Sequence, residues 1–141
     1  MDKYVLFVCT GNTCRSPMGA TIAKSIFEEH NINAQVYSAG VSAWNGQPAS
    51  NHAVTVMNDM DLDLTQHISQ SVSPKLLANA TVIFTMTAAH LAAIQDYCPV
   101  AKTIALNVSD PFGGSLETYR KTAIEIKDSI IKNLEDIKKY L

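Results

Sequence analysis

One short stretch decides the fold, and it reads Val5-Leu6-Phe7-Val8-Cys9-Thr10-Gly11-Asn12-Thr13-Cys14-Arg15-Ser16-Pro17. Residues 5–8 are β-branched or large and apolar, and because the run is too short for a helix it predicts a buried parallel strand. Gly11 and Asn12 tolerate backbone angles that most residues avoid. Pro17 suits an early position in a helix, where its missing N–H costs nothing. The stretch therefore predicts a strand, a tight loop and the first turn of a helix.

This predicted loop has the features of an anion site, because its backbone amides can turn inward at a helix N-terminus. Arg15 adds a planar guanidinium that matches phosphate oxygens in pairs. Cys9 ends the strand beneath this positive potential, which favours the thiolate form of its sulfur. Ser16 can donate a hydrogen bond to that sulfur or to the leaving phosphate. A buried cysteine before a crossover helix is common, but the combination with Arg15, Ser16 and Gly11-Asn12 predicts a phosphate-binding loop.

Length and composition predict one domain over residues 1–141, with 47% hydrophobic and 17% charged residues. The formal net charge of −2 gives no reason to expect nucleic acid or an anionic membrane as a partner. The three cysteines lack metal-ligand spacing, so we expect no metal and no other cofactor. The first apolar run is too short for a signal peptide, and no segment approaches membrane-spanning length. We therefore expect a cytoplasmic protein with reduced thiols.

Strands and helices alternate along the rest of the chain. Hydrophobic periodicity predicts further strands over 34–38, 81–86 and 102–106, and helices over 16–30, 49–60, 74–80, 87–96 and 116–140. Ser73 and Thr87 are the predicted N-caps of two of these helices. The alternation predicts an α/β fold of three layers, with helices on both faces of a four-stranded parallel sheet in the order 2-1-3-4. The Cys9 loop, which follows strand one, then lies at the switch point between strands one and three.

The predicted last helix has a solvent-exposed face on which acidic and basic residues lie four positions apart. These pairs predict ion pairs along the exposed face. They are Glu117 with Lys121, Asp128 with Lys132, and Glu135 with Lys139. We interpret this helix as scaffold.

The histidines and the single tryptophan are weaker candidates for a functional role. We expect His30 to be a solvated helix end and His52 to be structural, and His67 has no evident partner. For His90 we expect a local packing role, with a place at the rim of the site as the second interpretation. Trp44 lies in a polar loop, where a lone tryptophan usually packs as an anchor. Its alternative is a wall beside the site, since the loop follows the C-terminal end of a strand.

A loop with strong turn chemistry precedes the last helix, and it reads Asp110-Pro111-Phe112-Gly113-Gly114-Ser115. In the simple interpretation it is a turn before a helix. In the functional interpretation, Asp110 is a carboxyl placed over the Cys9 loop as a general acid.

With Cys9, Arg15, Ser16 and Asp110-Pro111 in these positions, the chain resembles the low-molecular-weight protein tyrosine phosphatase family. The resemblance covers the whole chain and includes Ser38-Ala39-Gly40 after the second strand. It implies that Cys9 is the nucleophile, Arg15 the phosphate clamp and Asp110 the general acid. Catalysis then proceeds by two-step hydrolysis through a phosphocysteine, on a phosphorylated protein or peptide, and we expect a monomer.

The same resemblance implies roles for the remaining loop residues. Ser16 and Asn12 look like the residues that support the thiolate and the loop geometry. Cys14 looks like the neighbour that forms a protective, reversible disulfide with Cys9. Phosphate is then bound by the whole loop: Thr10, Gly11, Asn12, Thr13, Cys14, Arg15 and Ser16.

The family is divided by substrate, and three positions bear on the choice: Thr13, Trp44 and Phe112. Tyrosine-specific members usually carry Ile or Leu in place of Thr13, and aromatic pairs in place of Phe112-Gly113. Thr13, the run that starts at Asp110, and Met86-Thr87 followed by His90 are similar to bacterial protein-arginine phosphatases. The Thr13 hydroxyl gives a planar phosphoguanidinium room and a hydrogen-bond partner, while Asp110 can pair with its charge.

The chain departs from the family pattern in two respects that do not follow from the predicted preference for phosphoarginine. Trp44 resembles the aromatic wall of tyrosine-specific members and so favours phosphotyrosine, which is the alternative substrate. Many relatives read Ser-Pro-Met-Ala-Glu where this chain has Met18-Gly19-Ala20 after Ser16-Pro17, so a carboxylate near the loop is missing.

Two other functions use similar residues. Arsenate reductase needs two further cysteines to relay a disulfide, and Cys98 is one candidate, but residues 85–90 contain no partner cysteine. A non-hydrolytic phosphocarrier or anion-binding module could hold phosphate on Cys9, but it needs neither Arg15 nor Asp110. Both functions rank below the phosphatase.

Overall fold

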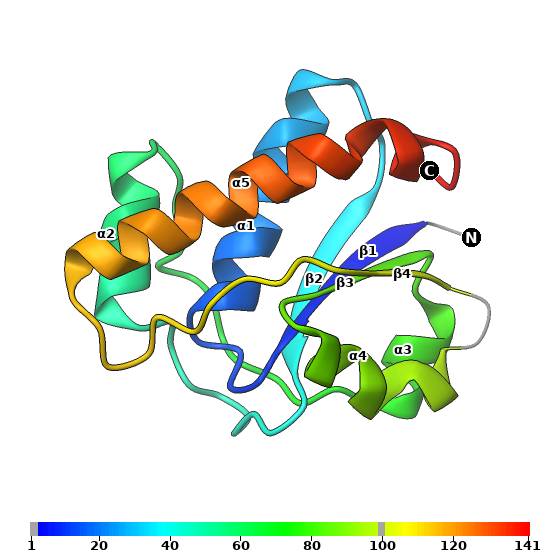
Figure 1. The fold of residues 1–141 in the computed structure, drawn as a ribbon, viewed down its shortest axis with the longest axis horizontal. Coiled ribbons are helices and arrows are strands. Elements are labelled where there is room, and N and C mark those ends of the chain that lie inside the picture. Colours follow the sequence, from blue (N-terminus) through cyan, green and yellow to red (C-terminus); the bar gives the residue numbers. More distant parts are fainter. Residues whose placement is uncertain (1–2, 99–100) are drawn as a thin grey trace.

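Four strands form one parallel sheet in the computed structural model, which describes residues 3–98 and 101–141 (Figure 1). The strands are β1 (Tyr4–Cys9), β2 (Gln35–Gly40), β3 (Val82–Thr85) and β4 (Lys102–Ala105). Their order across the sheet is β2-β1-β3-β4, and every pairing is parallel. The predicted sheet and its order are therefore confirmed.

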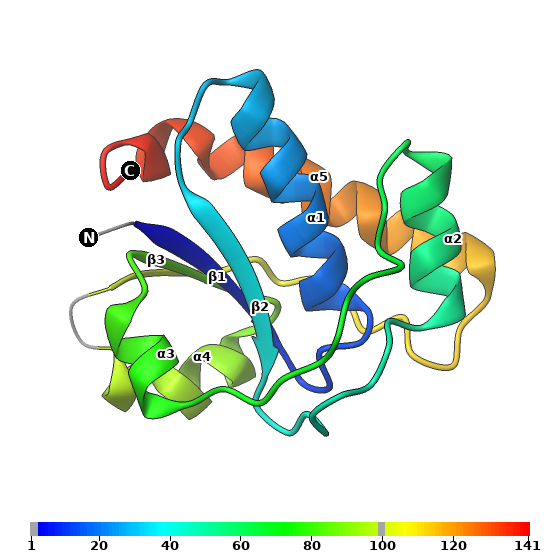
Figure 2. The same ribbon diagram turned by 180° about the vertical axis from the view of Figure 1, so that it is seen from behind.

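Helices cover both faces of this sheet (Figures 1 and 2). One face packs against α1 (Arg15–Glu29), α2 (Asn51–Asp59) and α5 (Leu116–Lys138). The other face packs against α3 (Pro74–Asn79) and α4 (Ala88–Ile94), which is followed by the single turn η1 (Gln95–Tyr97). The predicted three-layer architecture is confirmed.

The central strand β1 explains why the sheet is buried on both sides. Val5 and Phe7 lie in the core beneath α1 and α5, whereas Leu6 and Val8 lie in the core beneath α3 and α4. Successive side chains of a strand point to opposite faces, so a continuous apolar run fits a strand that is covered twice. None of these four side chains is exposed to solvent.

The two predicted N-caps are confirmed, but the helix predicted over 49–60 begins only at Asn51, and another predicted helix is shorter than expected. Ser73 and Thr87 cap α3 and α4 through their side-chain oxygens. The helix predicted over 87–96 ends as an α-helix at Ile94 and closes in the η1 turn. No helix among residues 3–98 and 101–141 combines the length and apolar character needed to cross a bilayer.

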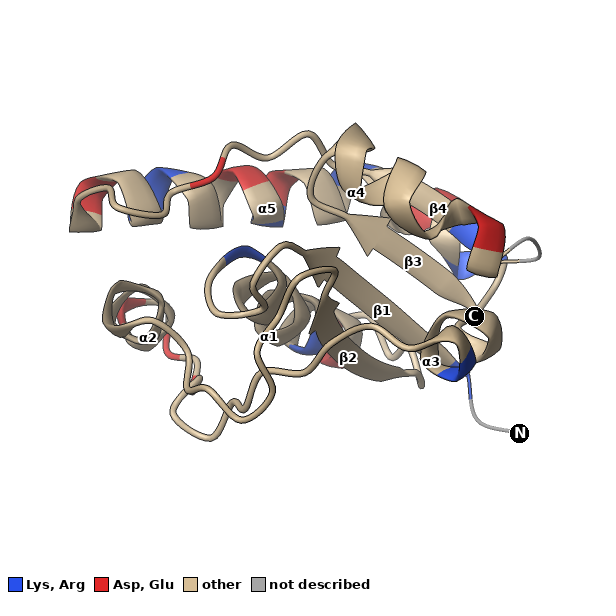
Figure 3. Ribbon diagram, turned by 90° about the horizontal axis from the view of Figure 1, so that it is seen from below, with Lys and Arg blue, Asp and Glu red and all other residues tan. Residues whose placement is uncertain are grey.

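The predicted ion pairs of α5 are wrong in their spacing. Positions with acidic and basic residues recur along α5 (Figure 3), but the ion pairs within it join residues three apart. Glu135 contacts Lys138 at 2.9 Å rather than Lys139. Arg120 contacts Glu117 at 3.8 Å, and it also reaches Asp59 of α2 at 3.2 Å. Side chains three and four apart are both neighbours on a helix, so long flexible side chains can choose either partner.

Candidate active site

Cys9 ends β1 at the point where the central strand enters the loop before α1, and only 2% of the residue is exposed. The backbone N–H of Asn12 donates to its sulfur at 3.3 Å, and the Ser16 hydroxyl lies 2.9 Å from the sulfur. The Asn12 amide donates to the same Ser16 oxygen at 2.8 Å, which leaves the hydroxyl proton of Ser16 for the sulfur. Both contacts to the sulfur are then donations, as an anionic sulfur requires.

Asn12 holds the loop in shape and is fully buried. Its φ of 56° lies in the left-handed region, which asparagine tolerates better than most residues, whereas Gly11 does not adopt a positive φ. Besides Ser16, its side-chain amide donates to the Ser38 hydroxyl at 2.9 Å, and its side-chain oxygen accepts the N–H of Gln70 at 2.9 Å. One side chain thus joins the loop to β2 and to the segment that precedes α3.

His67 is a part of this arrangement that the sequence did not reveal. Its Nε2 lies 2.7 Å from the Asn12 carbonyl oxygen, which can only accept, so Nε2 carries a proton and donates. Burial lowers the pKa of His67 below its ordinary value. The absence of an evident partner in the sequence was therefore misleading, because the partner lies 55 residues away along the chain.

Arg15 is the first residue of α1 and only 4% of it is exposed. Its Nη1 donates to the Val108 carbonyl at 3.1 Å, and its Nη2 lies 3.5 Å from a carboxylate oxygen of Asp110. Among the described residues, the buried Nε–H of Arg15 has no hydrogen-bond partner. Buried donors are nearly always satisfied, so this N–H is suited to a bound oxyanion. The N-cap residue Cys14 makes no side-chain capping bond within the described residues, which leaves the first helix amides for the same anion.

Asp110 lies on the segment between β4 and α5, far from the loop in sequence. One carboxylate oxygen faces Arg15, and the other accepts the N–H of Phe112 at 3.0 Å. The Asp110 side chain is 52% exposed, so it stays accessible from solvent while Arg15 fixes its direction. The structure thus places Asp110 against Arg15 and Ser16 against Cys9, and the role of Asp110 as general acid stays a prediction.

The remaining loop residues are tied to neighbouring elements. The Thr13 carbonyl accepts the N–H of Ser50, the N-cap of α2, at 2.8 Å, and Thr13 itself is partly buried. Cys14 is buried, and burial together with the nearby Cys9 sulfur raises the pKa of its thiol to about 11. All three cysteines of the chain are free, so the Cys9–Cys14 disulfide stays a prediction.

Gly40 lets the end of β2 pass directly against the loop. A Cβ at this position would lie 2.5 Å from the Thr10 carbonyl oxygen, closer than real Cβ atoms come. The next two residues then bond to the loop, since Val41 donates to the Cys9 carbonyl and Ser42 to the Thr10 carbonyl, both at 2.9 Å. The glycine that follows Ser38-Ala39 is therefore required by close backbone approach.

The sequence pattern of the family described as "Low molecular weight phosphotyrosine protein phosphatase" matches residues 4–141. The chain belongs to this family. It is a protein phosphatase of the cysteine-dependent type, and the loop between β1 and α1 is its candidate phosphate site.

The relatives of this phosphatase have been assigned two different substrates. It is 34% identical over 146 residues to a protein-arginine-phosphatase of Bacillus subtilis (strain 168), covering 96% of this chain and 97% of the relative. It is also 34% identical over 142 residues to the low molecular weight protein-tyrosine-phosphatase PtpB of Staphylococcus aureus, covering 94% and 97%. Sequence identity alone therefore does not show whether this phosphatase acts on phosphoarginine or on phosphotyrosine.

A solved structure of the YwlE arginine phosphatase is similar to this phosphatase over the full fold. The TM-score is 0.88 at 34% identity, and the match covers 99% of this chain and 97% of the other. That protein is a cysteine-to-serine mutant with a phosphorylated active-site serine.

The aromatic residues beside the loop differ from expectation in one respect. Trp44 is 82% exposed, so the expected anchor role is wrong, and its backbone rather than its ring is held, by the Ser69 hydroxyl. Phe112 is 81% exposed. The loops that carry them follow the C-terminal ends of β2 and β4, the edge of the sheet at which Cys9 lies. Both rings are free to contact a ligand.

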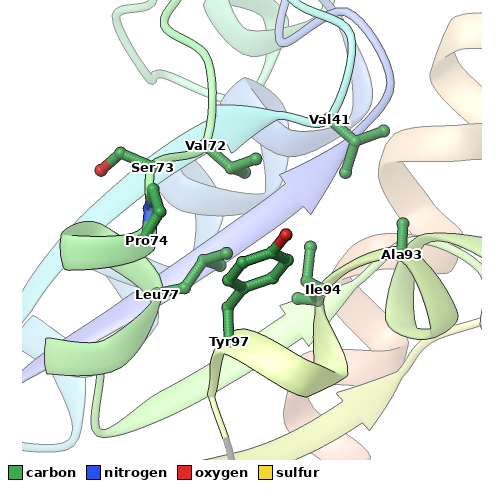
Figure 4. Close-up of a pocket in the computed structure, with 8 residues that line it drawn as sticks. All are labelled: Val41, Val72, Ser73, Pro74, Leu77, Ala93, Ile94 and Tyr97. Atoms are coloured by element: carbon green, nitrogen blue, oxygen red, sulfur yellow. The ribbon is translucent and has the colours of Figure 1, made fainter.

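A separate apolar cavity of about 270 Å³ lies on the α3–α4 side of the sheet (Figure 4). Val41, Leu77, Ile94 and Tyr97 are among its lining residues, and the Tyr97 ring lies across it. Cys98 is buried in the apolar core on this side, whereas Cys9 belongs to the core on the opposite side. This separation does not support a disulfide relay between the two cysteines, as arsenate reductase would need.

Metal ligation has no evident place within the described part of this phosphatase. Among residues 3–98 and 101–141, no three His, Cys, Asp or Glu side chains are grouped as metal ligands. Positive charge at the site comes instead from Arg15 and from the amides of the loop. The expectation that catalysis needs no metal or other cofactor stays a prediction.

Proposed function

We propose that this phosphatase hydrolyses phosphoarginine in proteins or peptides through a phosphocysteine on Cys9, as a cytoplasmic monomer without a cofactor. The observation that carries the proposal is the convergence of three groups from distant parts of the chain. The Cys9 sulfur accepts donors from the loop, Arg15 lies at the start of α1, and the Asp110 carboxylate contacts Arg15. Free cysteines fit the cytoplasm, where thiols stay reduced.

In the first step the Cys9 thiolate attacks phosphorus in line with the leaving group. A sulfur–phosphorus bond forms as the phosphorus–nitrogen bond breaks. Arg15, whose Nε–H has no partner among the residues that the structure describes, and the amides of the loop stabilise the charge on the equatorial oxygens. Asp110 donates its proton to the leaving guanidine nitrogen, and its partly exposed side chain can reach that atom.

In the second step water releases the phosphate. The Asp110 carboxylate takes a proton from the attacking water, and the sulfur–phosphorus bond breaks. Inorganic phosphate leaves and the thiolate is restored. The Ser16 hydroxyl, 2.9 Å from the sulfur, can stabilise the returning negative charge.

Replacing Cys9 with serine tests this scheme. The serine hydroxyl is a much weaker nucleophile, so we expect turnover to be abolished while the loop still binds inorganic phosphate. Phosphate release and phosphate titration by NMR measure the two properties. An active serine variant would refute the scheme. A stable phosphocysteine on the wild-type protein, without phosphate release, would favour the phosphocarrier.

Thr13 and Asp110 support the preference for phosphoarginine. Thr13 is partly buried in the loop, and its hydroxyl can pair with the polar guanidinium of the substrate. Asp110 keeps an accessible carboxyl group beside Arg15, whose oxygen can accept a hydrogen bond from the guanidinium of the substrate. An apolar ring of phosphotyrosine can use neither interaction.

The variant Thr13→Ile tests this preference, with Thr13→Ser as the matched control that keeps the hydroxyl. We expect Thr13→Ile to shift the ratio of kcat/KM for phosphoarginine over phosphotyrosine by about tenfold toward phosphotyrosine, the worth of one hydrogen bond. Phosphate release from two peptides that differ only in the phosphorylated residue measures the ratio. An unchanged ratio in Thr13→Ile would show that Thr13 does not set specificity.

Phosphotyrosine is the second candidate substrate, and a specific observation favours it. Trp44 and Phe112 are two exposed aromatic side chains on loops that leave the same edge of the sheet as Cys9. Aromatic side chains of this kind can stack on a phenyl ring. If phosphotyrosine is the substrate, Trp44→Ala lowers kcat/KM for phosphotyrosine and leaves that for phosphoarginine unchanged.

A further inference from the structure

His90 lies closer to the loop than its sequence position suggests. It is on the first turn of α4 and only 6% exposed. Its ring Nδ1 accepts the backbone N–H of Thr87 at 3.2 Å and lies 3.0 Å from the Thr87 hydroxyl oxygen. The backbone N–H of His90 donates to the same Thr87 hydroxyl at 3.3 Å, and these contacts together cap α4. Its other ring nitrogen, Nε2, lies 2.8 Å from the hydroxyl oxygen of Thr10. His90 therefore connects the cap of α4 with the residue that follows Cys9.

These contacts determine where the imidazole carries its proton. Because the Thr87 N–H donates to Nδ1, that nitrogen must be the acceptor, and a neutral ring then carries its proton on Nε2. The Nε2–H donates to the Thr10 oxygen, so the hydroxyl proton of Thr10 points elsewhere. Thr10 is exposed, and its carbonyl is already held by Ser42. The free hydroxyl proton of Thr10 is thus available at the surface of the phosphate loop.

On the basis of the function proposed above, we propose that His90 is a positioning residue of the phosphatase reaction. Its Nε2–H fixes the Thr10 hydroxyl, and with it the start of the phosphate loop, in the orientation that the bound phosphoryl group needs. His90 itself does not touch the substrate. It acts through Thr10, whose remaining hydroxyl proton can be donated to a phosphoryl oxygen.

The surroundings keep the ring in the required neutral state. Burial lowers the pKa of His90, the positive charge of Arg15 on α1 lowers it further, and Asp110 between β4 and α5 partly opposes this. Cys9 is the remaining titratable neighbour along the chain, on the other side of Thr10. Protonation would place an N–H on Nδ1 against the N–H of Thr87, where two donors face each other. The Nε2–H persists in the cation, so acid is expected to disturb the cap of α4 first and, by moving the ring that the cap holds, the orientation of Nε2 toward Thr10.

Two substitutions separate positioning from helix capping. In His90→Asn the side-chain oxygen can replace Nδ1 as the acceptor for Thr87, but the amide is too short to reach Thr10. In His90→Gln the amide nitrogen can replace Nε2 as the donor to Thr10, and the side chain no longer titrates. We expect His90→Asn to lose about tenfold in kcat/KM with an unchanged fold by circular dichroism, and His90→Gln to keep most activity.

A double-mutant cycle and a pH profile complete the test. Thr10→Val removes the hydroxyl at nearly constant shape, so adding it to His90→Asn is expected to cost no further activity. In His90→Gln the acid side of the kcat/KM profile is expected to extend to lower pH than in the wild type. Full activity of His90→Asn, equal losses in both His90 variants, or additive losses in the double mutant would each overturn the proposal.

A structural readout separates this proposal from the proposed function. Imidazole ¹⁵N shifts of the wild-type protein are expected to report a neutral His90 with its proton on Nε2. A proton on Nδ1 at neutral pH would overturn the positioning role even if the enzyme is active. Failure of the wild type to release phosphate from either peptide would instead overturn the proposed function, and the ¹⁵N result would still decide the tautomer.

Discussion

Asn12 shows how far the geometry of the site depends on one residue. Its backbone adopts the left-handed conformation, and its backbone N–H donates to the Cys9 sulfur. Its buried side chain contacts Ser16, Ser38 and Gln70 at the same time. A residue with these contacts must combine tolerance of a positive φ with two donors and an acceptor, and asparagine meets these demands.

Asn12→Ala is therefore expected to be less stable than Asn12→Gly, although both remove the same side chain. Each variant leaves buried groups unsatisfied, at about 1–3 kcal/mol in the free energy of unfolding. Alanine adds about 1–2 kcal/mol, because it meets a steric penalty at positive φ that glycine avoids. Urea denaturation measures the difference. Equal stability of the two variants would contradict the role assigned to the backbone of Asn12.

Asp110→Asn tests the assignment of the general acid. The asparagine oxygen can still accept the N–H of Phe112, so the loop is expected to keep its shape. Without an acid, kcat is expected to fall by about 10²–10⁴-fold for phosphoarginine peptides. The loss should be smaller for a nitrophenyl phosphate, whose leaving group needs little protonation. Similar losses on the two substrates would argue that Asp110 acts only by orienting Arg15.

At the scale of elements, α1 contains a glycine, Gly19, where the helix packs against the sheet. A Cβ at Gly19 would lie 2.8 Å from a ring carbon of Phe7 and 3.1 Å from the end of Met86. Phe7 belongs to β1 and is fully buried, and its ring stacks on Phe84 of β3. The glycine therefore lets α1 approach the centre of the sheet closely, beside the loop that precedes the helix.

Gly19→Ala is expected to destabilise the protein, against the usual effect of alanine in a helix. Alanine gains about 1 kcal/mol in helix propensity, but overpacking a tight core costs about 1–3 kcal/mol. We expect a lower Tm, measured by thermal unfolding. Lys24→Ala, at an exposed position of the same helix, is the control and should change stability by less than about 0.5 kcal/mol. A higher Tm for Gly19→Ala would refute the packing argument.

The elements themselves were largely predictable, because their signals are local. The apolar run at residues 5–8 and the Ser73-Pro74 cap each depend on neighbours within a few positions. The spacing of the α5 ion pairs was not predictable, since Arg120 also reaches Asp59 of α2, and tertiary contacts of this kind leave no local pattern.

At the scale of the whole molecule, the half-buried His67 and the buried His90 link the stability of the fold to pH. Burial lowers the pKa of both His67 and His90 below the ordinary value of 6.5. In the unfolded chain these side chains bind protons near that ordinary value, while in the folded chain they resist protonation. Stability is therefore retained above pH 6.5 and is lost as the pH falls from there through the lower folded pKa values.

We expect the double variant His67→Gln/His90→Gln to lose less stability on acidification than the wild type. Glutamine can keep the donation to Asn12 at position 67 and to Thr10 at position 90, but it does not titrate. Urea denaturation between about pH 5 and pH 8 gives the slope for both proteins. The same slope in both would place the acid sensitivity in other groups.

The reacting residues of the site were more predictable from the sequence than the residues that hold the loop in place. Cys9 and Arg15 lie in one recognisable string, and Asp110 follows from the turn chemistry around it. Ser38, His67 and Gln70 act on the loop only after folding, so the sequence could not assign them. The exposed Trp44 was wrongly expected to be buried, because a lone tryptophan in a loop gives no sign of which side it faces.

The hydrogen bond from Arg15 to the Val108 carbonyl has a consequence for any kinetic study of this enzyme. The guanidinium proposed to bind the phosphate also donates a hydrogen bond to the chain two residues before Asp110. Its Nη2 faces the Asp110 carboxylate itself. Truncating Arg15 would therefore remove the phosphate-binding guanidinium and would also free Asp110 to move. The loss of activity in such a mutant would combine the loss of phosphate binding with the displacement of Asp110. Subtracting the loss measured for Asp110→Asn would therefore give a wrong value for either contribution.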